Sequence, residues 1–341
     1  MSEPSSGLVG LASSVGNSVG RHFGLTTALP SLFLTVWVYG LIAARPWSVN
    51  GGLGVALAAL AELNPVKVTW LVAASLLVGL FLHPLEFAGT QLLEGYWGTG
   101  RLSRILAGRR VRHHRRLYRG LRELEGHEAS AWKAAVNEML GPGDHTAEER
   151  DTKLASAQGD AVAARRRTEE EARRLAGRYP GGERIMPTRL GNALRQLEDG
   201  VGAQYGLDVL RVAPHLALIA PDRHLAYLND ARQQLDLAVR LCTVCLLASV
   251  VSVAALLPDG LWLFVTLVPY VGAYVAYRGA VVAALGYGTV VATVLDLNRF
   301  ELYRILGLVR PSDTSAERDG NRTLGRLLAG DDEVFVQYRD C

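Results

Sequence analysis

Long uncharged apolar runs alternate along the chain with densely charged stretches. Four of these runs approach the length of about 20 apolar residues that a helix needs to cross a hydrocarbon core about 30 Å thick. They cover residues 26–44, 68–87, 237–258 and 261–277, and a basic residue stands at or near an end of each one. The pattern therefore predicts an all-α integral membrane protein with about four transmembrane helices.

The first run raises the alternative of a cleaved signal peptide. Its apolar stretch is longer than the usual core of about 7 to 15 residues, and no clear A-x-A cleavage site follows it. Arg21 is the only positive charge close before it. These features favour an uncleaved span.

Positive charge is unevenly distributed, although 36 basic residues nearly balance 33 acidic ones and leave a formal net charge of +3. The connection 45–67 holds two basic residues, and the turn at 259–260 holds none. By contrast, nine arginines lie from Arg101 to Arg122 with no acidic residue among them. Because Lys and Arg accumulate on the cytoplasmic side, this asymmetry predicts a multi-pass protein of the plasma (inner) membrane with both termini cytoplasmic.

Five parts follow from these spans. A cytoplasmic N-terminal segment (1–25) precedes transmembrane helices 1 and 2 (26–87) with a short external connection. A cytoplasmic helical region (88–236) leads to a transmembrane hairpin, helices 3 and 4 (237–277), turned by Asp259 and Gly260. A cytoplasmic C-terminal helix and tail (278–341) complete the chain.

Two assignments stay open. The apolar stretch 54–63 is too short to cross, and it fits either a short interfacial helix or an extension of a neighbouring span. Residues 279–297 compete as a fifth crossing. We disfavour the fifth crossing because Arg278 interrupts the run, and because it places the C-terminal tail outside.

Several short helices are expected in the cytoplasmic parts. From 102 to 121 a rough apolar stripe predicts a helix with an arginine-rich girdle, and another helix is expected beyond Gly126. The stripe comprises Leu102, Ile105, Leu106, Leu117 and Leu121. Leucines at 190, 194 and 197 predict a helix begun near Pro187 or Thr188, and a glycine-containing turn and a second short helix follow up to Pro221.

Two further helices complete the expected cytoplasmic parts. Asp222 is expected to cap a long helix that runs into the third span. Leu324, Leu327 and Leu328 mark a short helix in the tail.

The arginine-rich stretch is the best candidate binding site. Arginines beside a membrane span bind anionic headgroups at about 1 kcal/mol each near the surface. A weak, salt-sensitive affinity for nucleic acid is expected from the same charge, so we predict no specific nucleic-acid partner. The predicted lipid contacts are Arg101, Arg104, Arg109, Arg110, Arg112, Arg115, Arg116 and Arg119.

Metal and redox sites are disfavoured, and no cofactor is predicted. His113 and His114 are adjacent, so on a helix they point about 100° apart, and we expect a solvated or headgroup-facing pair. His83 and Glu86 have the i, i+3 spacing of a carboxylate-bridged metal site, but the other spans offer no matching ligands. Cys242 and Cys245 lie inside an apolar run, where small hydrophobic residues are the simpler interpretation than a redox pair.

No catalytic or nucleotide-binding motif occurs in the sequence, so a non-enzymatic protein is expected. The leading hypothesis is a scaffold or interaction protein that presents cytoplasmic helices to a protein partner. An oligomeric channel or pore-forming effector is the alternative, suggested by polar residues such as Thr243, Ser249 and Ser252 in the spans. An interfacial enzyme rests only on His83 and Glu86, and a homo-oligomer is left open.

The stretch MPTRLGNALRQLEDGVGAQYGLDV at 186–209, together with FELYRILGL at 300–308, resembles a family of multi-pass membrane proteins of actinobacteria and other bacteria. The resemblance covers about half of the chain, from Met186 onward. It implies the same membrane architecture and carries no activity. The helix after Arg278 is more apolar here than in that family, which puts its cytoplasmic placement in question.

Overall fold

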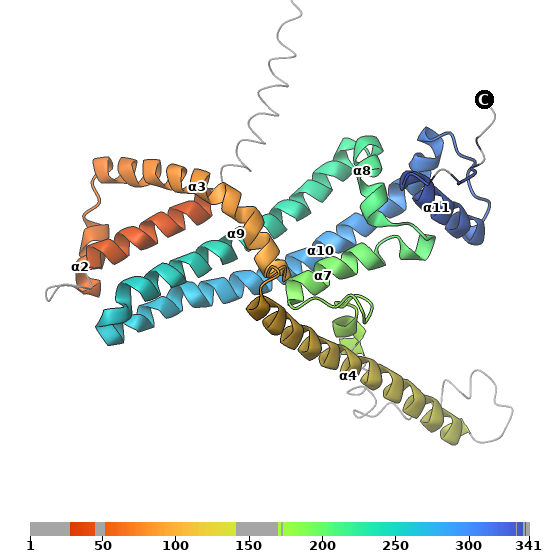
Figure 1. The fold of residues 1–341 in the computed structure, drawn as a ribbon, viewed down its shortest axis with the longest axis horizontal. Helices are drawn as coiled ribbons and strands as arrows, with labels where there is room; N and C mark the ends of the chain where they lie inside the picture. The colour runs from red at the N-terminus through yellow and green to blue at the C-terminus, as the bar shows by residue number, and fades with distance from the viewer. Residues whose placement is uncertain are drawn as a thin grey trace, which may run out of the picture. The chain divides into compact units, whose positions relative to one another are not determined.

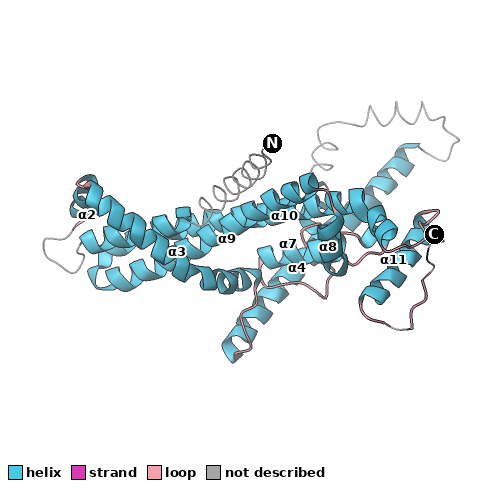
Figure 2. Cartoon of the chain, turned by 90° about the horizontal axis from the view of Figure 1, so that it is seen from above, coloured by secondary structure: helices cyan, strands magenta, loops and turns pink. Residues whose placement is uncertain are grey.

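The computed structural model describes residues 28–44, 52–140, 170–171, 173–331, 333–336 and 338, without the side chains of residues 53, 83, 86, 124–140, 258 and 259. This part of the chain is helical and contains no strand, apart from one isolated bridge between Leu308 and Tyr338 (Figure 2). The all-α prediction is therefore confirmed. The predicted N-terminal segment 1–25 lies outside the described residues.

The described helices begin with an unlabelled apolar helix, Ala28–Ala44. The labelled α-helices are α2 (Leu53–Ala61), α3 (Pro65–Glu94), α4 (Arg101–Leu140), α7 (Arg189–Gly200), α8 (Val209–Ile219), α9 (Asp222–Leu256), α10 (Leu267–Ile305) and α11 (Thr314–Leu328) (Figure 1). Two 3-10 helices, η1 (Ala203–Tyr205) and η2 (Leu257–Thr266), form turns. The chain divides into a first unit, Met1–Leu93 with Pro221–Val290, and a second unit, Glu94–Ala220 with Val291–Cys341.

Three segments of the described chain are long and apolar enough to cross a membrane. They are Pro65–Leu82 in α3, Asp222–Leu256, which is α9, and Gly260–Ile305, which contains α10. The helix Ala28–Ala44 is apolar but shorter. Two of the three long segments overlap the second and third predicted spans, 68–87 and 237–258, and the fourth predicted span lies inside the last segment.

The first unit packs the helix Ala28–Ala44 against α3 and α9. Leu34, Val244 and Ala248 are buried together, and Val78 and Leu82 of α3 pack against them. Trp37 adds a polar contact, because its Nε1 donates a hydrogen bond to Ser252 Oγ at 2.8 Å.

Helices α9 and α10 lie side by side in the first unit (Figures 1 and 2). Ala276, Ala280 and Ala284 recur every fourth residue on α10, and all three are buried. A Cβ placed at Gly272 would lie only 3.3 Å from Cys245 Sγ. Small residues at this spacing let two helices approach closely.

Several predicted details of the helices are wrong. The reversal between the third and fourth apolar runs is the 3-10 helix η2, not a two-residue turn at Asp259 and Gly260. The N-cap residue of helix α9 is Pro221, so Asp222 is the first residue of the helix and not its cap. The two helices expected on either side of Gly126 are one helix, α4.

Two open assignments are resolved at the level of secondary structure. Helix α10 continues without a break through Arg278, so 279–297 extends the fourth apolar run and does not form a separate helix. The stretch 54–63 belongs mainly to α2, a separate helix. Helix α2 ends at Ala61, and three residues separate it from the start of α3 at Pro65.

The second unit has its own hydrophobic core, built from α8, the end of α10 and α11. Its buried members are Leu207, Val212, Leu216, Leu295, Leu302, Tyr303, Leu308 and Leu324. Glycines shape the turn that leads into α8: Gly202 and Gly206, on either side of η1, have positive φ angles of 81° and 72°. The predicted pair of short helices across a glycine turn is thus confirmed as α7 and α8.

Candidate membrane-surface site

Helix α4 has one buried or half-buried face and one exposed, arginine-rich face. Ser103, Ala107, Val111, His114 and Tyr118 recur at intervals of three or four residues, and all are buried or half-buried. The predicted helix with an arginine-rich girdle is present, but four members of its apolar stripe, Leu102, Ile105, Leu106 and Leu117, are exposed, and only Leu121 is half-buried. The stripe of large apolar residues is therefore mostly separate from the half-buried face of the helix.

The eight predicted lipid-contact arginines all lie on α4 and are all exposed. Among the described residues none of them has an ion-pair partner, and Arg115 makes a single long hydrogen bond, from Nη2 to the Glu183 carbonyl at 3.4 Å. An exposed helix with this much unneutralised positive charge attracts anions electrostatically. The arrangement is chemically suited to phosphate-bearing headgroups, since guanidinium groups bind phosphate oxygens in pairs.

His114 joins α4 to the segment that precedes α7. Its Nδ1 lies 3.0 Å from the Tyr179 hydroxyl. The backbone of Pro187 also interacts with the imidazole, and because proline has no N–H this interaction involves its carbonyl and favours the protonated ring.

The environment of His114 holds the imidazole neutral. Burial lowers the pKa of His114 to about 4, and the nearby His113 and the guanidinium of Arg110 act in the same direction. The expectation of two solvated histidines is wrong for His114, which is buried, and correct for His113, which is exposed. The sequence feature that could have indicated this burial is the helical spacing of His114 from Ala107, Val111 and Tyr118, which places it on the buried or half-buried face of α4.

The stretch PTRLGN explains how α7 is attached to the end of α3. Thr188 caps α7 by accepting a hydrogen bond from the Gly191 N–H at 3.0 Å, and its hydroxyl donates to the Glu94 carbonyl at 2.8 Å. One side chain thus serves the start of one helix and the end of another. The predicted start of this helix near Pro187 or Thr188 is confirmed.

Gly191 and Asn192 complete this junction. A Cβ at Gly191 would lie 2.0 Å from the Glu94 carbonyl oxygen, so the backbones approach too closely for any side chain. Asn192 is buried, and its amide donates to the Met186 and Thr188 carbonyls while its Oδ1 accepts from the Met186 N–H. The presence of glycine at 191 is therefore explained by the close approach of two backbones, and that of asparagine at 192 by its hydrogen bonds to Met186 and Thr188.

A second polar cluster joins η1, α10 and α11. Arg299 Nε lies 2.7 Å from Glu317 Oε1, and the guanidinium stacks 4.2 Å from the centre of the Tyr205 ring. Asn321 donates to the Tyr205 carbonyl at 2.8 Å and accepts from the Tyr303 hydroxyl. The YGLD and RFELY stretches, 205–208 and 299–303, thus meet at one cluster.

The remaining candidate sites gain no support as chemical centres. The side chains of His83 and Glu86 lie outside the described residues. No group of three or more His, Cys, Asp or Glu side chains in the described part is placed to hold a metal ion. Cys242 and Cys245 are buried free thiols on α9.

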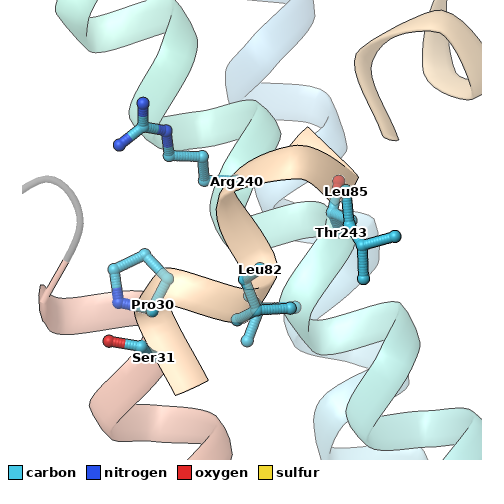
Figure 3. A pocket seen from close by; sticks show the side chains of 8 residues that line it. Pro30, Ser31, Leu82, Leu85, Arg240 and Thr243 are labelled. Carbon is cyan, nitrogen blue, oxygen red and sulfur yellow. The ribbon is translucent and has the colours of Figure 1, made fainter. Parts of the chain in front are cut away.

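A small cavity lies in the first unit between the helix Ala28–Ala44, α3 and α9. It is lined by Pro30, Ser31, Gly79, Leu82, Leu85, Arg240, Thr243 and Val244. Its volume is about 20 Å³, room for roughly one water molecule, and the Arg240 guanidinium points away from Leu82 and Thr243 (Figure 3). This cavity is too small to bind an organic ligand.

The span hydroxyls that suggested a channel bond within their own helix. Thr243, Ser249 and Ser252 each donate to the carbonyl four residues earlier, at 2.7 to 2.9 Å. Ser249 and Ser252 are also buried. Their placement is explained by packing in α9.

No protein-family model matches the chain, and no match emerges among the curated proteins or the solved structures with which it was compared.

Proposed function

We propose that this chain is a four-span, non-enzymatic protein of the plasma membrane that holds its second unit at the cytoplasmic face and contacts anionic lipid through α4. One observation carries the proposal: eight exposed arginines, which have no ion-pair partner among the described residues, lie on a single helix that follows a membrane-length apolar helix within seven residues. The resemblance to bacterial multi-pass proteins supports the same architecture.

A scaffold role is supported by the way the second unit is built. Its polar clusters fasten helix ends to one another, and no group of three or more His, Cys, Asp or Glu side chains among its described residues is placed to hold a metal ion. Helix α8 leaves apolar side chains in the open, since Leu210 and Leu218 are exposed. Exposed apolar residues grouped on one helix are typical of a docking surface for a protein partner.

The topology is tested with Cys341 and an introduced cysteine. A membrane-impermeant maleimide is expected to label Cys341 only after cells are opened, and to label Glu62→Cys in the loop before α3 in intact cells. Because Cys242 and Cys245 are buried on α9, both remain unlabelled in the native fold. Labelling of Cys341 in intact cells contradicts the proposed orientation.

The lipid contact is tested by measuring the ratio of phosphatidylglycerol to phosphatidylcholine retained on protein purified in mild detergent. The triple variant Arg109→Gln, Arg112→Gln and Arg116→Gln is expected to lower that ratio. The control changes the same charge at Arg304, Arg322 and Arg326, which are exposed but ion-paired. Equal ratios in the two triple variants contradict a specific role for α4.

The scaffold role is tested by a photo-crosslinking amino acid at position 218, with position 322 on α11 as the control. A reproducible adduct at 218 that is absent at 322 is expected in native membranes. The adduct mass separates a second copy of the chain from another protein. Absence of any adduct at 218 contradicts a partner at α8, and dye leakage from vesicles that contain the purified protein supports the channel alternative instead.

A further inference from the structure

The first two turns of α4 expose a cluster of apolar side chains. Leu102 is 78% exposed, and Ile105 and Leu106 are each 53% exposed. Their i, i+3, i+4 spacing places them on one side of the helix. Large apolar groups gathered in this way on a water-facing helix lower solubility unless something covers them.

Arginines replace these apolar residues further along the same side of α4. Arg109, Arg112 and Arg116 continue the three- and four-residue spacing from Leu102 and Ile105, and all three are exposed. On this side the helix is thus apolar in its first two turns and cationic beyond them, whereas Arg101 and Arg104 of the same turns are also exposed. Helices that lie in a bilayer interface combine an apolar surface with a basic one in this manner.

The connection before α4 keeps this apolar end close to the point where α3 ends. Helix α3 ends at Glu94 and α4 begins at Arg101, so six residues separate the two helices. Such a segment spans at most about 20 Å. Tyr96, which is exposed, and Trp97 lie in the connection, and both residue types are enriched at membrane interfaces.

We infer that the first two turns of α4 insert Leu102, Ile105 and Leu106 into the interfacial layer of the cytoplasmic leaflet, while the following arginines contact the phosphates. The bilayer is the occupant of this surface because the adjoining charge is uniformly positive and the preceding helix is of membrane length. The inference rests on the proposed membrane topology. It adds that the three apolar side chains lie below the level of the phosphates, a depth that charge attraction alone does not produce.

The test is a depth measurement on the full chain in nanodiscs of phosphatidylcholine and phosphatidylglycerol. Single nitroxide labels are placed at 102, 106 and 117 in a background in which Cys242, Cys245 and Cys341 are replaced by alanine. Leu117 is the matched control, because it is also an exposed leucine of α4 but lies eleven or more residues beyond the apolar cluster. Collision rates with oxygen, which concentrates in lipid, and with a water-soluble nickel chelate are compared at each site.

The expected result is an oxygen-to-nickel collision ratio several-fold higher at 102 and 106 than at 117. Equal ratios at the three sites overturn the inference. Shielding of 102 and 106 from both reagents also overturns it, because that result indicates contact with protein instead of lipid.

Together with the lipid-retention and maleimide experiments, this test distinguishes a failure of the insertion from a failure of the proposed function. If phosphatidylglycerol enrichment and the predicted topology hold while 102 and 106 remain nickel-accessible, the insertion is wrong and the proposed function stands. If the labels are buried in lipid but enrichment does not depend on Arg109, Arg112 and Arg116, the insertion is supported and the proposed headgroup contact fails.

Discussion

The two units hold their helices together by different means. In the first unit, small residues such as Ala280 and Ala284 allow close contact, and hydroxyls such as that of Ser249 are satisfied within their own helix. In the second unit, side chains reach from one helix to the backbone or side chains of another, as Thr188 and Arg299 do. The number of polar groups used between helices is therefore the main difference between the units.

This difference has a physical cause if the first unit lies in hydrocarbon. Lipid tails are as apolar as leucine, so burying a leucine between helices brings no hydrophobic gain there, and close packing of small residues becomes the main attraction. In water the hydrophobic effect supplies the attraction, and polar contacts then fix how the helix ends meet. Substitutions of one type should consequently have unequal effects in the two units.

The largest effect is expected for Gly191→Ala. In most helix interiors alanine stabilises relative to glycine by about 1 kcal/mol. At Gly191 the new Cβ would meet the Glu94 carbonyl oxygen at 2.0 Å, a backbone atom that cannot move aside without displacing the end of α3. We expect a loss of more than about 3 kcal/mol in the free energy of unfolding of the second unit.

Hydrogen exchange of the α7 amides in detergent measures this loss. Gly325→Ala on α11 is the matched control, because its Cβ would meet nothing within 4 Å. The control should leave exchange unchanged or slow it. Equal exchange in the two variants contradicts the close approach of α7 to the end of α3.

The next largest effect is expected for Glu317→Ala. The side chain of Glu317 is 5% exposed and that of Arg299 is 19% exposed, so the variant leaves a largely buried guanidinium without its carboxylate. Removing one partner of a buried pair costs about 3 to 5 kcal/mol. Because Arg299 keeps its stacking on Tyr205 and its bond to the Asp296 carbonyl, we expect a loss below that range, of about 2 to 3 kcal/mol in the free energy of unfolding.

Thermal unfolding of the detergent-solubilised protein provides the measurement. Asp319→Ala removes the partner of Arg322 in a pair whose side chains are 71% and 73% exposed. Such pairs contribute about 0 to 1 kcal/mol, so this control should unfold almost as the wild type does. Similar losses in both variants would show that burial of the Arg299 pair has no energetic consequence.

The sequence was sufficient for the features that depend on local patterns. The leucines at 190, 194 and 197 and the capping residue Thr188 located α7, and the apolar runs located the long helices. The burial of His114 was missed, because its partner Tyr179 lies 65 residues away. The junction at Gly191 was likewise not predictable, since Thr188 bonds to a residue 94 positions earlier.

The outward direction of the leucines on α4 was missed for a related reason. A stripe of large apolar residues usually marks the packing face of a helix in water. Here the segment with Tyr179 packs on the side of α4 that carries His114 and Tyr118, and it leaves Leu102 and Leu106 exposed. A helix face that contacts lipid and one that packs in a protein core can have the same apolar composition. The sequence of the stripe alone therefore does not show which of the two it contacts.

An intermediate effect is expected from pH, through His114. Its pKa is about 4 in the folded protein, below the usual 6.5 of the unfolded chain. Between these values the unfolded state binds a proton that the folded state does not, so the stabilisation is complete above pH 6.5 and is lost as the pH falls towards 4. From pH 7.5 to 5 we expect the second unit to lose about 2 kcal/mol.

Unfolding at a series of pH values, in wild type and in His114→Gln, isolates this contribution. The variant should be less stable at pH 7.5, because Gln does not reproduce the packing of the buried ring and its bond to the Tyr179 hydroxyl, and it should lose less stability on acidification. His113→Gln, at the exposed neighbouring position, should keep the wild-type pH dependence. A wild-type slope in His114→Gln contradicts the assignment of a neutral, buried imidazole.

The smallest effect is expected for Ser252→Ala in the first unit. This variant removes the acceptor of the Trp37 Nε1–H at 2.8 Å, an interhelical hydrogen bond of ordinary length in a buried position. In a water-soluble core, leaving such a donor unpaired costs about 1 to 3 kcal/mol. Inside a bilayer, interhelical hydrogen bonds average only about 0.6 kcal/mol, because helices that separate in the membrane find other partners.

Unfolding in mixed micelles of increasing SDS content, followed by tryptophan fluorescence, measures this loss. We expect a value near 0.6 kcal/mol for Ser252→Ala and a smaller one for the control Ser249→Ala, whose hydroxyl donates within α9. A loss of about 2 kcal/mol or more would mean that this hydrogen bond in the first unit has the energy expected in a water-soluble core, and the contrast between the two units would then lie in composition alone.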